Sequence, residues 1–327
     1  MLKMSKLYLV TGGTGHVGTV LINELLAKNV SIRALVRPGR REGIPAGVDV
    51  YEGDITNLDS MRDFFQTSGF DSVTLIHCAA LITITSRLNT QVWNVNVHGT
   101  ENVMQLALNA AVDRVVYVSS VHAIPEKPLG QIISEVSSFS PELVHGQYAK
   151  SKAAAAQVAL DYAKKGLNLS IVHPSGIIGP GDTNIRNHMI RTIHAMAEGR
   201  IPIGLKGGYD FVDSRDVVSG ILSCEEKGRC GECYILTGHY ITVLQLLNVV
   251  RKIHGKKERK IEIPYGLVKA IAPISEGAAR LIGRKAPLFT PYSVYTLHTN
   301  GDFSHEKATR ELDYQPRDIV DSIRDSL

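Results

Sequence analysis

The stretch LYLVTGGTGHVG, residues 7–18, decides the fold of this chain. An apolar, β-favouring run leads directly into glycines, and an amphipathic pattern of valine, leucine and isoleucine follows from Val17. Glycine is needed where the backbone takes a positive φ and where a side chain would block a diphosphate, and the start of the following helix offers free N–H groups. The order strand, glycines, helix therefore predicts a dinucleotide-binding turn rather than a tight turn without a ligand.

The composition is that of an ordinary soluble globular protein. The 327 residues are 44% hydrophobic and 21% charged, with a net charge of +4, which allows one large α/β domain with an added lobe. We expect no nucleic-acid partner, because the strongest basic run, 256–260, includes an acid and follows a predicted helix. Without a signal peptide or an apolar run of membrane-spanning length, we expect a cytoplasmic protein with no membrane insertion. A homodimer is compatible with these features.

The four cysteines indicate reduced, structural thiols. Cys230 and Cys233 alone have a suggestive spacing, but a zinc site needs a second ligand pair, and Cys224 with His239 is an unconvincing one. We therefore expect no metal site.

Extended apolar segments and helical patterns alternate along the first half of the chain. Strands are expected at 7–10, 31–36, 49–51, 72–77, 114–119 and 169–173, and helices at 17–28, 58–67, 92–111 and 148–165. This alternation predicts a doubly wound, Rossmann-type α/β fold, in which a parallel sheet is covered on both faces. Ligands of such sheets bind outside the carboxyl ends of the strands. We assign the dinucleotide-binding domain to residues 1–175.

The pattern loosens after Pro174. Helices at 188–198, 243–254 and 266–272 are separated by loops with glycine and proline, which predicts a smaller, mainly substrate-binding lobe over residues 176–327. The segment 208–222 is expected to return to the main sheet. The apolar helical stretch 264–283 is expected to break at Pro273 and to form a pocket wall.

Tyr148 and Lys152 are four residues apart and so share one face of a helix. A neighbouring cation favours the phenolate, which would lower the pKa of Tyr148 and suit it to proton transfer near neutral pH. Ser119 and Ser120 end the preceding strand, where a hydroxyl group can bond a substrate oxygen. His77, also at a strand end, is interpreted as a hydrogen-bonded structural residue.

These motifs, in this order, resemble an extended short-chain dehydrogenase/reductase of the NAD-dependent epimerase/dehydratase superfamily. They are Thr11-Gly12 with Gly15 and Gly18, Gly53-Asp54-Ile55, residues 77–80, Asn96 before Gly99-Thr100, Ser119-Ser120, Tyr148 with Lys152, and residues 174–182, 208–217, 303–308 and 314–317. The segments 174–182 and 208–217 are most similar to dihydroflavonol-4-reductase-like and 3β-hydroxysteroid-dehydrogenase-like proteins. The chain departs from the pattern at His173, where arginine is common, and at Val121-His122, where small residues are frequent.

The resemblance implies a catalytic set and a cofactor site. Tyr148 would be the general acid/base, Lys152 would hold the nicotinamide ribose and tune Tyr148, and Ser120 would orient the substrate carbonyl. Asp54 and Ile55 would lie by the adenine, Ala79 and Ala80 in the cofactor groove, and Pro174 by the nicotinamide. The full expected cofactor-binding set is Thr11, Gly12, Gly13, Thr14, Gly15, His16, Val17, Gly18, Arg37, Arg40, Asp54, Ile55, Ala79, Ala80, Asn96, Ser119, Tyr148, Lys152, Pro174 and Ser175.

The leading interpretation is an NADP(H)-dependent oxidoreductase that reduces a carbonyl, or oxidises the alcohol, of a fairly bulky apolar small molecule. Arg37 and Arg40 stand after the second strand, where an NAD-preferring fold places an acid, so NADP(H) is preferred and NAD(H) remains an alternative. The stretches 176–179, 201–205 and 286–289 favour an apolar cavity.

Two other functions stay open. A nucleotide-sugar epimerase or dehydratase would use the same cofactor apparatus and needs cations for a diphosphate, for which Arg186, Arg191 and Arg215 are candidates. A non-enzymatic redox-sensing protein on the same fold is disfavoured, because it has no need of the proton-transfer pair Tyr148 and Lys152.

Overall fold

A computed structural model describes residues 5–85, 88–182, 185, 187–281 and 290–327 of the chain. Among these residues, seven strands form one parallel sheet in the order β10-β6-β5-β4-β1-β2-β3. Its strands are β1 (Lys6–Thr11), β2 (Ser31–Val36), β3 (Asp49–Glu52), β4 (Ser72–His77), β5 (Arg114–Val118), β6 (Leu169–Pro174) and β10 (Cys233–Leu236). The strand order reverses between β1 and β4, which is where a doubly wound fold binds its ligand.

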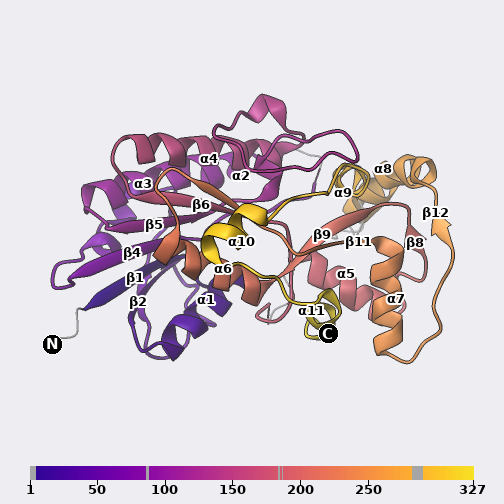
Figure 1. Ribbon diagram of the computed structural model, residues 1–327, viewed down its shortest axis with the longest axis horizontal. Helices are drawn as coiled ribbons and strands as arrows, with labels where there is room; N and C mark the ends of the chain where they lie inside the picture. Colours follow the sequence, from indigo (N-terminus) through magenta and orange to yellow (C-terminus); the bar gives the residue numbers. More distant parts are fainter. Residues whose placement is uncertain (1–4, 86–87, 183–184, 186, 282–289) are drawn as a thin grey trace.

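Helices cover both faces of this sheet, as the sequence predicts (Figure 1). On one face α3 (Gly99–Asn109) and α4 (Gln147–Lys164) enclose a core that includes Leu75, Met104 and Ile171. On the other face α1 (His16–Ala27), α6 (Ser214–Lys227) and α10 (Glu306–Leu312) cover Val10 and Ile76. Near-continuous hydrophobic strands are stable here because neither face of the sheet meets water.

A smaller lobe stands beyond the carboxyl ends of the main strands (Figure 1). Its three-stranded sheet has the order β11-β9-β7, and a two-stranded sheet pairs β12 with β8. The strands are β7 (Gly176–Ile178), β8 (Gly204–Leu205), β9 (Gly208–Asp213), β11 (His239–Thr242) and β12 (Glu262–Ile263). The helices are α5 (His188–Ala197), α7 (Val243–Ile253), α8 (Tyr265–Leu281), α9 (Pro291–Thr296) and α11 (Ile319–Arg324).

Several of these elements differ from what the sequence predicts. The segment 208–222 returns to the main sheet only through α6, because β9 pairs with β7 and β11; β10 takes the main-sheet edge beside β6. The expected helix at 58–67 is two 3₁₀ turns, η1 (Leu58–Met61) and η2 (Asp63–Phe65), in which Met61, Phe64 and Phe65 are buried. Helix α8 runs on through Pro273, whose ring lies on the exposed side.

Short helical pieces complete the main domain. Helix α2 (Thr90–Trp93) leads through a π-helical turn, η3 (Asn94–His98), into α3, where one continuous helix at 92–111 was expected. The 3₁₀ turns η4 (Val121–Ala123) and η5 (Pro141–Leu143) lie between β5 and α4. Turns of the π type often accompany functional sites, and η3 lies against α4.

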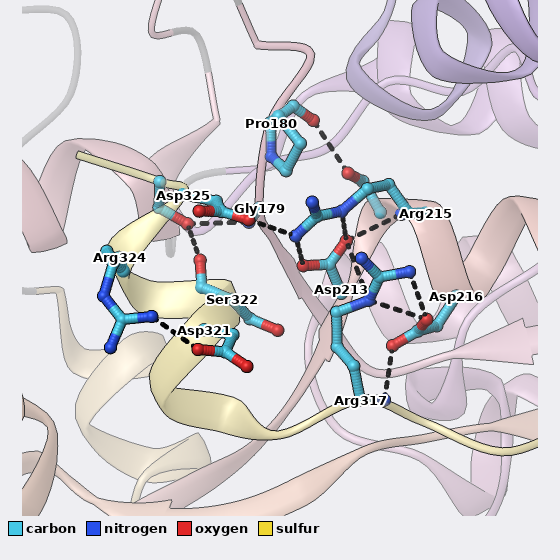
Figure 2. A network of polar contacts seen from close by, with 12 residues as sticks. Gly179, Pro180, Asp213, Arg215, Asp216, Arg317, Asp321, Ser322, Arg324 and Asp325 are labelled. Carbon is cyan, nitrogen blue, oxygen red and sulfur yellow. Dashed lines mark hydrogen bonds and ion pairs between the residues drawn. The ribbon is translucent and has the colours of Figure 1, made fainter.

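The end of the chain is fastened to the main domain by a polar network (Figure 2). Arg215, in the first turn of α6, bonds the fully buried carboxylate of Asp213 at 2.8 Å and reaches Asp325 at 2.7 Å. Arg317 pairs with Asp216 at 2.9 Å. The residues that follow α10 are therefore held where β9 ends.

Candidate active site

The glycine turn between β1 and α1 presents bare backbone at the carboxyl edge of the sheet. Gly12 has a φ of 74°, and a Cβ atom there would lie 2.7 Å from the backbone nitrogen of Ala79. A Cβ atom at Gly18 would lie 2.2 Å from the carbonyl oxygen of Gly12, and Gly13 is buried between them. Gly15 donates its N–H to the Gly12 oxygen at 3.0 Å and has no side chain to cap α1. Only glycine fits at positions 12 and 18, and the turn leaves the N-terminus of α1 open to an anion.

The other residues of the turn have different surroundings. Thr14 is half-buried, and Val17 is buried against the sheet. The His16 ring reaches the smaller lobe, with Nε2 2.8 Å from the carbonyl oxygen of Pro180 and Nδ1 3.0 Å from Nδ2 of Asn187. His16 therefore connects the glycine turn to the start of α5.

The loop after β4 forms a wall beside the glycine turn. Ala79 and Ala80 are half-buried there. Asn96, in the π-helical turn, accepts a hydrogen bond from the Leu81 nitrogen at 2.7 Å and donates to the Leu81 oxygen at 3.1 Å and to Oγ of Ser151 at 2.9 Å. Its side chain thus holds this loop against α4, so Asn96 would act on a cofactor through the loop.

His77 is a structural residue, as expected. Its ring is fully buried, with Nδ1 2.6 Å from Oγ1 of Thr11 and Nε2 3.1 Å from Oγ1 of Thr100. Burial and the nearby Lys152 lower the pKa of His77 to about 3. A neutral ring with both nitrogens engaged ties β1, β4 and α3 together and has no capacity left for acid/base work.

The expected adenine end lies at the ends of β2 and β3. Asp54 follows β3 and accepts from the nitrogen and hydroxyl of Thr56 at 2.9 Å and 2.7 Å, while Ile55 is buried. Arg37 and Arg40 are exposed after β2. Their neighbour Arg41 instead forms an ion pair with Glu52 at 2.9 Å.

Ser119 and Ser120 follow β5, and both are buried. Oγ of Ser120 accepts the N–H of His122 at 3.2 Å and so caps η4. The carbonyl oxygen of Ser120 lies 3.0 Å from Nδ1 of His173. Burial lowers the pKa of His173 to about 4, so its neutral ring donates to Ser120. His173, which stands where arginine is common, therefore positions the loop that contains Ser120.

Helix α4 brings Tyr148 and Lys152 to the same edge, but they do not interact as expected. Nζ of Lys152 donates to the carbonyl oxygen of Val118 at 2.9 Å and to the hydroxyl of Tyr117 at 3.2 Å, and burial lowers its pKa to about 7. Burial also raises the pKa of Tyr148 to about 12, although a hydrogen bond with Ser120 acts to lower it. The expected lowering by Lys152 was wrong, because both groups lose hydration and Lys152 turns toward β5.

Pro174 ends β6, and Ser175 follows it into the smaller lobe. Oγ of Ser175 donates to a carboxylate oxygen of Asp210, which also accepts the N–H of Gly238 at 3.1 Å. Burial raises the pKa of Asp210 to about 6. Ser175 is thus held by β9 at the boundary between the two sheets.

An aromatic cluster beside Tyr148 escaped the sequence analysis. The His122 ring lies 5.9 Å from the ring of Tyr148 and 6.1 Å from that of Tyr292, and its Nε2 is 2.7 Å from the hydroxyl of Tyr209. A small pocket adjoins this cluster and is lined in part by His122, Tyr209 and Ala149. In the sequence, the one indication of this cluster was His122, which stands where small residues are frequent.

The apolar stretches expected to line the cavity have another role. Ile178, Ile201 and Leu205 are buried in the core of the smaller lobe, with α5 and α7. The stretch 286–289 lies outside the described residues.

Of the three arginines considered for a diphosphate, Arg215 is engaged by two carboxylates. Arg191 lies on α5, and Arg186 falls outside the described part of the chain.

Neither a metal cluster nor a membrane helix is found in the part of the chain that the structure describes. No group of three His, Cys, Asp or Glu side chains is placed to hold a metal ion there. Cys230 is exposed and Cys233 buried, both as free thiols. Among the same residues, no helix is long and apolar enough to cross a membrane.

A glycine turn at the switch point of a doubly wound sheet, facing a Ser–Tyr–Lys edge, defines a dinucleotide-dependent enzyme. A sequence profile of the NAD dependent epimerase/dehydratase family matches residues 8–236, and the chain belongs to this family, the extended short-chain dehydrogenases/reductases. The protein is an NAD(P)-dependent oxidoreductase.

The similarity to known proteins covers nearly the whole chain. The chain is 33% identical to sterol demethylase protein B of Methylococcus capsulatus, over 98% of this chain and 96% of the relative. It is 27% identical to a 3-beta-hydroxysteroid dehydrogenase of Mycolicibacterium neoaurum, over 94% and 86% respectively. The crystal structure of gox2253 superimposes with a TM-score of 0.83 at 31% identity, covering 98% of this chain and 96% of the other.

The residues present fit the dinucleotide that the family uses. Gly12 and Gly18 let the turn pack tightly against backbone, and the exposed Gly15 leaves the N-terminus of α1 without a capping side chain. Diphosphate oxygens are the groups that such a helix start binds. Ala79 follows β4 and Asp54 follows β3, on the two sides of β1 in the main sheet.

Proposed function

We propose that the protein is an NADP(H)-dependent reductase of bulky, apolar carbonyl compounds, with Tyr148 as the proton donor. The observation that carries this proposal is the pocket beside Tyr148, whose lining among the described residues includes neither lysine nor arginine. Most of its lining residues are aliphatic or aromatic, and Glu126, Thr299 and Asn300 add a few polar groups, a combination found in sites for uncharged organic ligands. A sugar diphosphate would need charge-assisted donors there.

The bound dinucleotide supplies the hydride, and the chain handles the proton. Because burial raises the pKa of Tyr148 to about 12, its hydroxyl stays protonated at neutral pH and is ready to donate to the oxygen of a reduced carbonyl. Oγ of Ser120 is the neighbouring group that can hold that oxygen.

The function is tested by following NADPH oxidation against a panel of hydrophobic ketones, aldehydes and steroid ketones. We expect net consumption of NADPH with at least one of them, and no rise in melting temperature with UDP- or dTDP-sugars, since only a ligand selective for the folded state stabilises it. A clear rise with a UDP-sugar, together with no cofactor oxidation on any carbonyl compound, would favour an epimerase instead.

The same assay tests the cofactor preference. Arg37 and Arg40 are exposed after β2 and can pair with a 2′-phosphate. We expect a KM for NADPH at least about tenfold below that for NADH, as one charge-assisted hydrogen bond allows. The double variant Arg37→Ala/Arg40→Ala should lose this preference, whereas Arg62→Ala, which removes a surface arginine paired with Asp59, should keep it. Equal or better use of NADH by the unaltered protein would refute the preference.

The proton step is tested by Tyr148→Phe, which keeps the ring and its packing. Turnover should fall by roughly 100-fold to 10,000-fold, the usual cost of losing a general acid, while the affinity for NADPH stays the same. Tyr162→Phe is the matched control, because Tyr162 lies on the same helix and its hydroxyl bonds Gln105 at 2.9 Å. If Tyr148→Phe kept more than about a tenth of the turnover of the unaltered protein, Tyr148 would not be the proton donor.

A further inference from the structure

The ring of Tyr292 fits beside the helix that carries Tyr148 because Gly146 has no side chain. It lies in α9, whose start is capped by Thr290 in a capping box, and the hydroxyl of Thr290 also donates to the carbonyl oxygen of Ile84 at 2.6 Å. A Cβ atom at Gly146 would lie 2.3 Å from Cε2 of Tyr292. Gly146 has a φ of 88° and is the N-cap of α4, two residues before Tyr148. The Tyr292 ring therefore lies against the start of the helix that carries Tyr148.

The hydroxyl of Tyr292 is buried without a hydrogen-bond partner among the residues that the structure describes. The nearby phenol of Tyr209 differs, because it bonds Nε2 of His122 at 2.7 Å. Leaving a buried hydroxyl unpaired costs on the order of 1–3 kcal/mol. In a functional cleft, such a hydroxyl group can form a hydrogen bond with a ligand that binds there.

Tyr292 and Tyr148 both contact the ring of His122. Both rings pack on His122, at 6.1 Å and 5.9 Å between centroids. Burial, and then the proximity of Tyr148, raises the pKa of Tyr292, so its hydroxyl remains a donor at any working pH. A substrate whose carbonyl oxygen meets Tyr148 would bring its adjoining atoms toward Tyr292.

We propose that the Tyr292 hydroxyl donates a hydrogen bond to a second oxygen of the substrate, so that the site selects carbonyl compounds with a further carbonyl or hydroxyl group next to the reacting one. This inference rests on the proposed reductase function. It adds to that function a subsite made by α9, a helix that follows Tyr148 by more than a hundred residues in the sequence.

The test uses two probes that differ by one oxygen, 1-phenylpropane-1,2-dione and 1-phenylpropan-2-one, with NADPH as the reductant. The dione is intrinsically the more reactive, so the measured quantity is the ratio of their kcat/KM values in Tyr292→Phe relative to the unaltered protein. We expect this ratio to fall about tenfold, near the upper range for one neutral hydrogen bond, mainly through the dione. Tyr295→Phe is the control on the same helix, since its hydroxyl bonds Glu126 at 2.7 Å. It should leave the ratio unchanged.

The melting temperature supplies a readout that does not depend on activity. Removing an unpaired buried hydroxyl should leave the melting temperature of Tyr292→Phe equal or higher, whereas a drop of several degrees would reveal a structural partner and overturn the inference. An unchanged ratio, with both ketones reduced, would overturn it while the reductase function stands. If the unaltered protein oxidises NADPH with no carbonyl compound of the panel, the proposed function fails and this inference fails with it.

Discussion

At the scale of the residue, Gly18 is the position where adding a single methyl group should disturb the structure most. Its Cα faces the carbonyl oxygen of Gly12, and an added Cβ atom would lie 2.2 Å from that oxygen and 2.8 Å from Cα of Gly13. Both contacts are to backbone, which cannot rotate away as a side chain would. Gly18→Ala must therefore separate α1 from the glycine turn.

We expect Gly18→Ala to weaken NADPH binding by about tenfold or more, because the N–H groups of a displaced helix start no longer converge on the anion. Titration of NADPH by fluorescence or calorimetry measures this. Gly266→Ala is the control, since Gly266 lies in a helix and a Cβ atom there meets nothing within 4 Å. Unchanged NADPH affinity in Gly18→Ala would show that the dinucleotide binds elsewhere.

At the scale of the element, the Arg215 network holds the C-terminal helix α11 to the start of α6 (Figure 2). Burial would raise the pKa of Asp213, but hydrogen bonds from Arg215 hold that pKa below its ordinary value. Arg317 lies 3.9 Å from the same carboxylate and is mainly bound to Asp216. Removing Arg215 leaves a buried charge with a weaker partner.

Arg215→Met, which retains the apolar stem, should lower the free energy of unfolding by about 2–3 kcal/mol, because an uncompensated buried carboxylate is costly. Urea denaturation measures the change. Arg324→Met is the matched control: Arg324 pairs with Asp321 on the surface, with both side chains more than half exposed, and such pairs contribute less than ~1 kcal/mol. Equal losses in the two variants would mean that burial at Asp213 has no energetic consequence.

At the scale of the whole molecule, buried histidines make stability depend on pH. Burial lowers the pKa of His77 to about 3 and those of His122 and His173 to about 4. Their ordinary value is 6.5, so between pH 6.5 and 4 the unfolded chain binds protons that the folded chain does not. Stability is therefore full above pH 6.5 and falls as the pH drops toward 4. Asp210, whose pKa is raised to about 6, offsets part of this loss.

Each histidine with a pKa of about 4 should contribute roughly 2 kcal/mol to the loss between pH 7.5 and pH 5. Urea midpoints at the two pH values measure the total. His173→Gln should lose less than the unaltered protein over this interval, whereas His98→Gln, at the surface, should lose the same amount. Stability that is constant from pH 7.5 to 5 would contradict neutral burial of these rings.

Local patterns were enough for the fold of the first domain. The glycine turn, the strands at 31–36 and 72–77, and the helix that carries Tyr148 and Lys152 all lie where the sequence placed them. Each of these features depends on residues within one turn or one strand of each other: positive φ at Gly12, apolar runs that exclude water, and helical spacing. The family resemblance rests on the same local motifs.

The interior of the site depended on tertiary packing. Tyr148, Tyr209 and Tyr292 belong to three separate segments, and only the fold places them around the ring of His122. Lys152 was expected to act on Tyr148, yet it turns toward Val118, because in a buried site the nearest carbonyl oxygen replaces lost water. The sequence by itself determined most strands and helices of the main sheet, and it predicts the end of that sheet at which a dinucleotide would bind. Tertiary structure alone decided which groups share the pocket, since hydration and hydrogen-bond partners are set by neighbours distant in the chain.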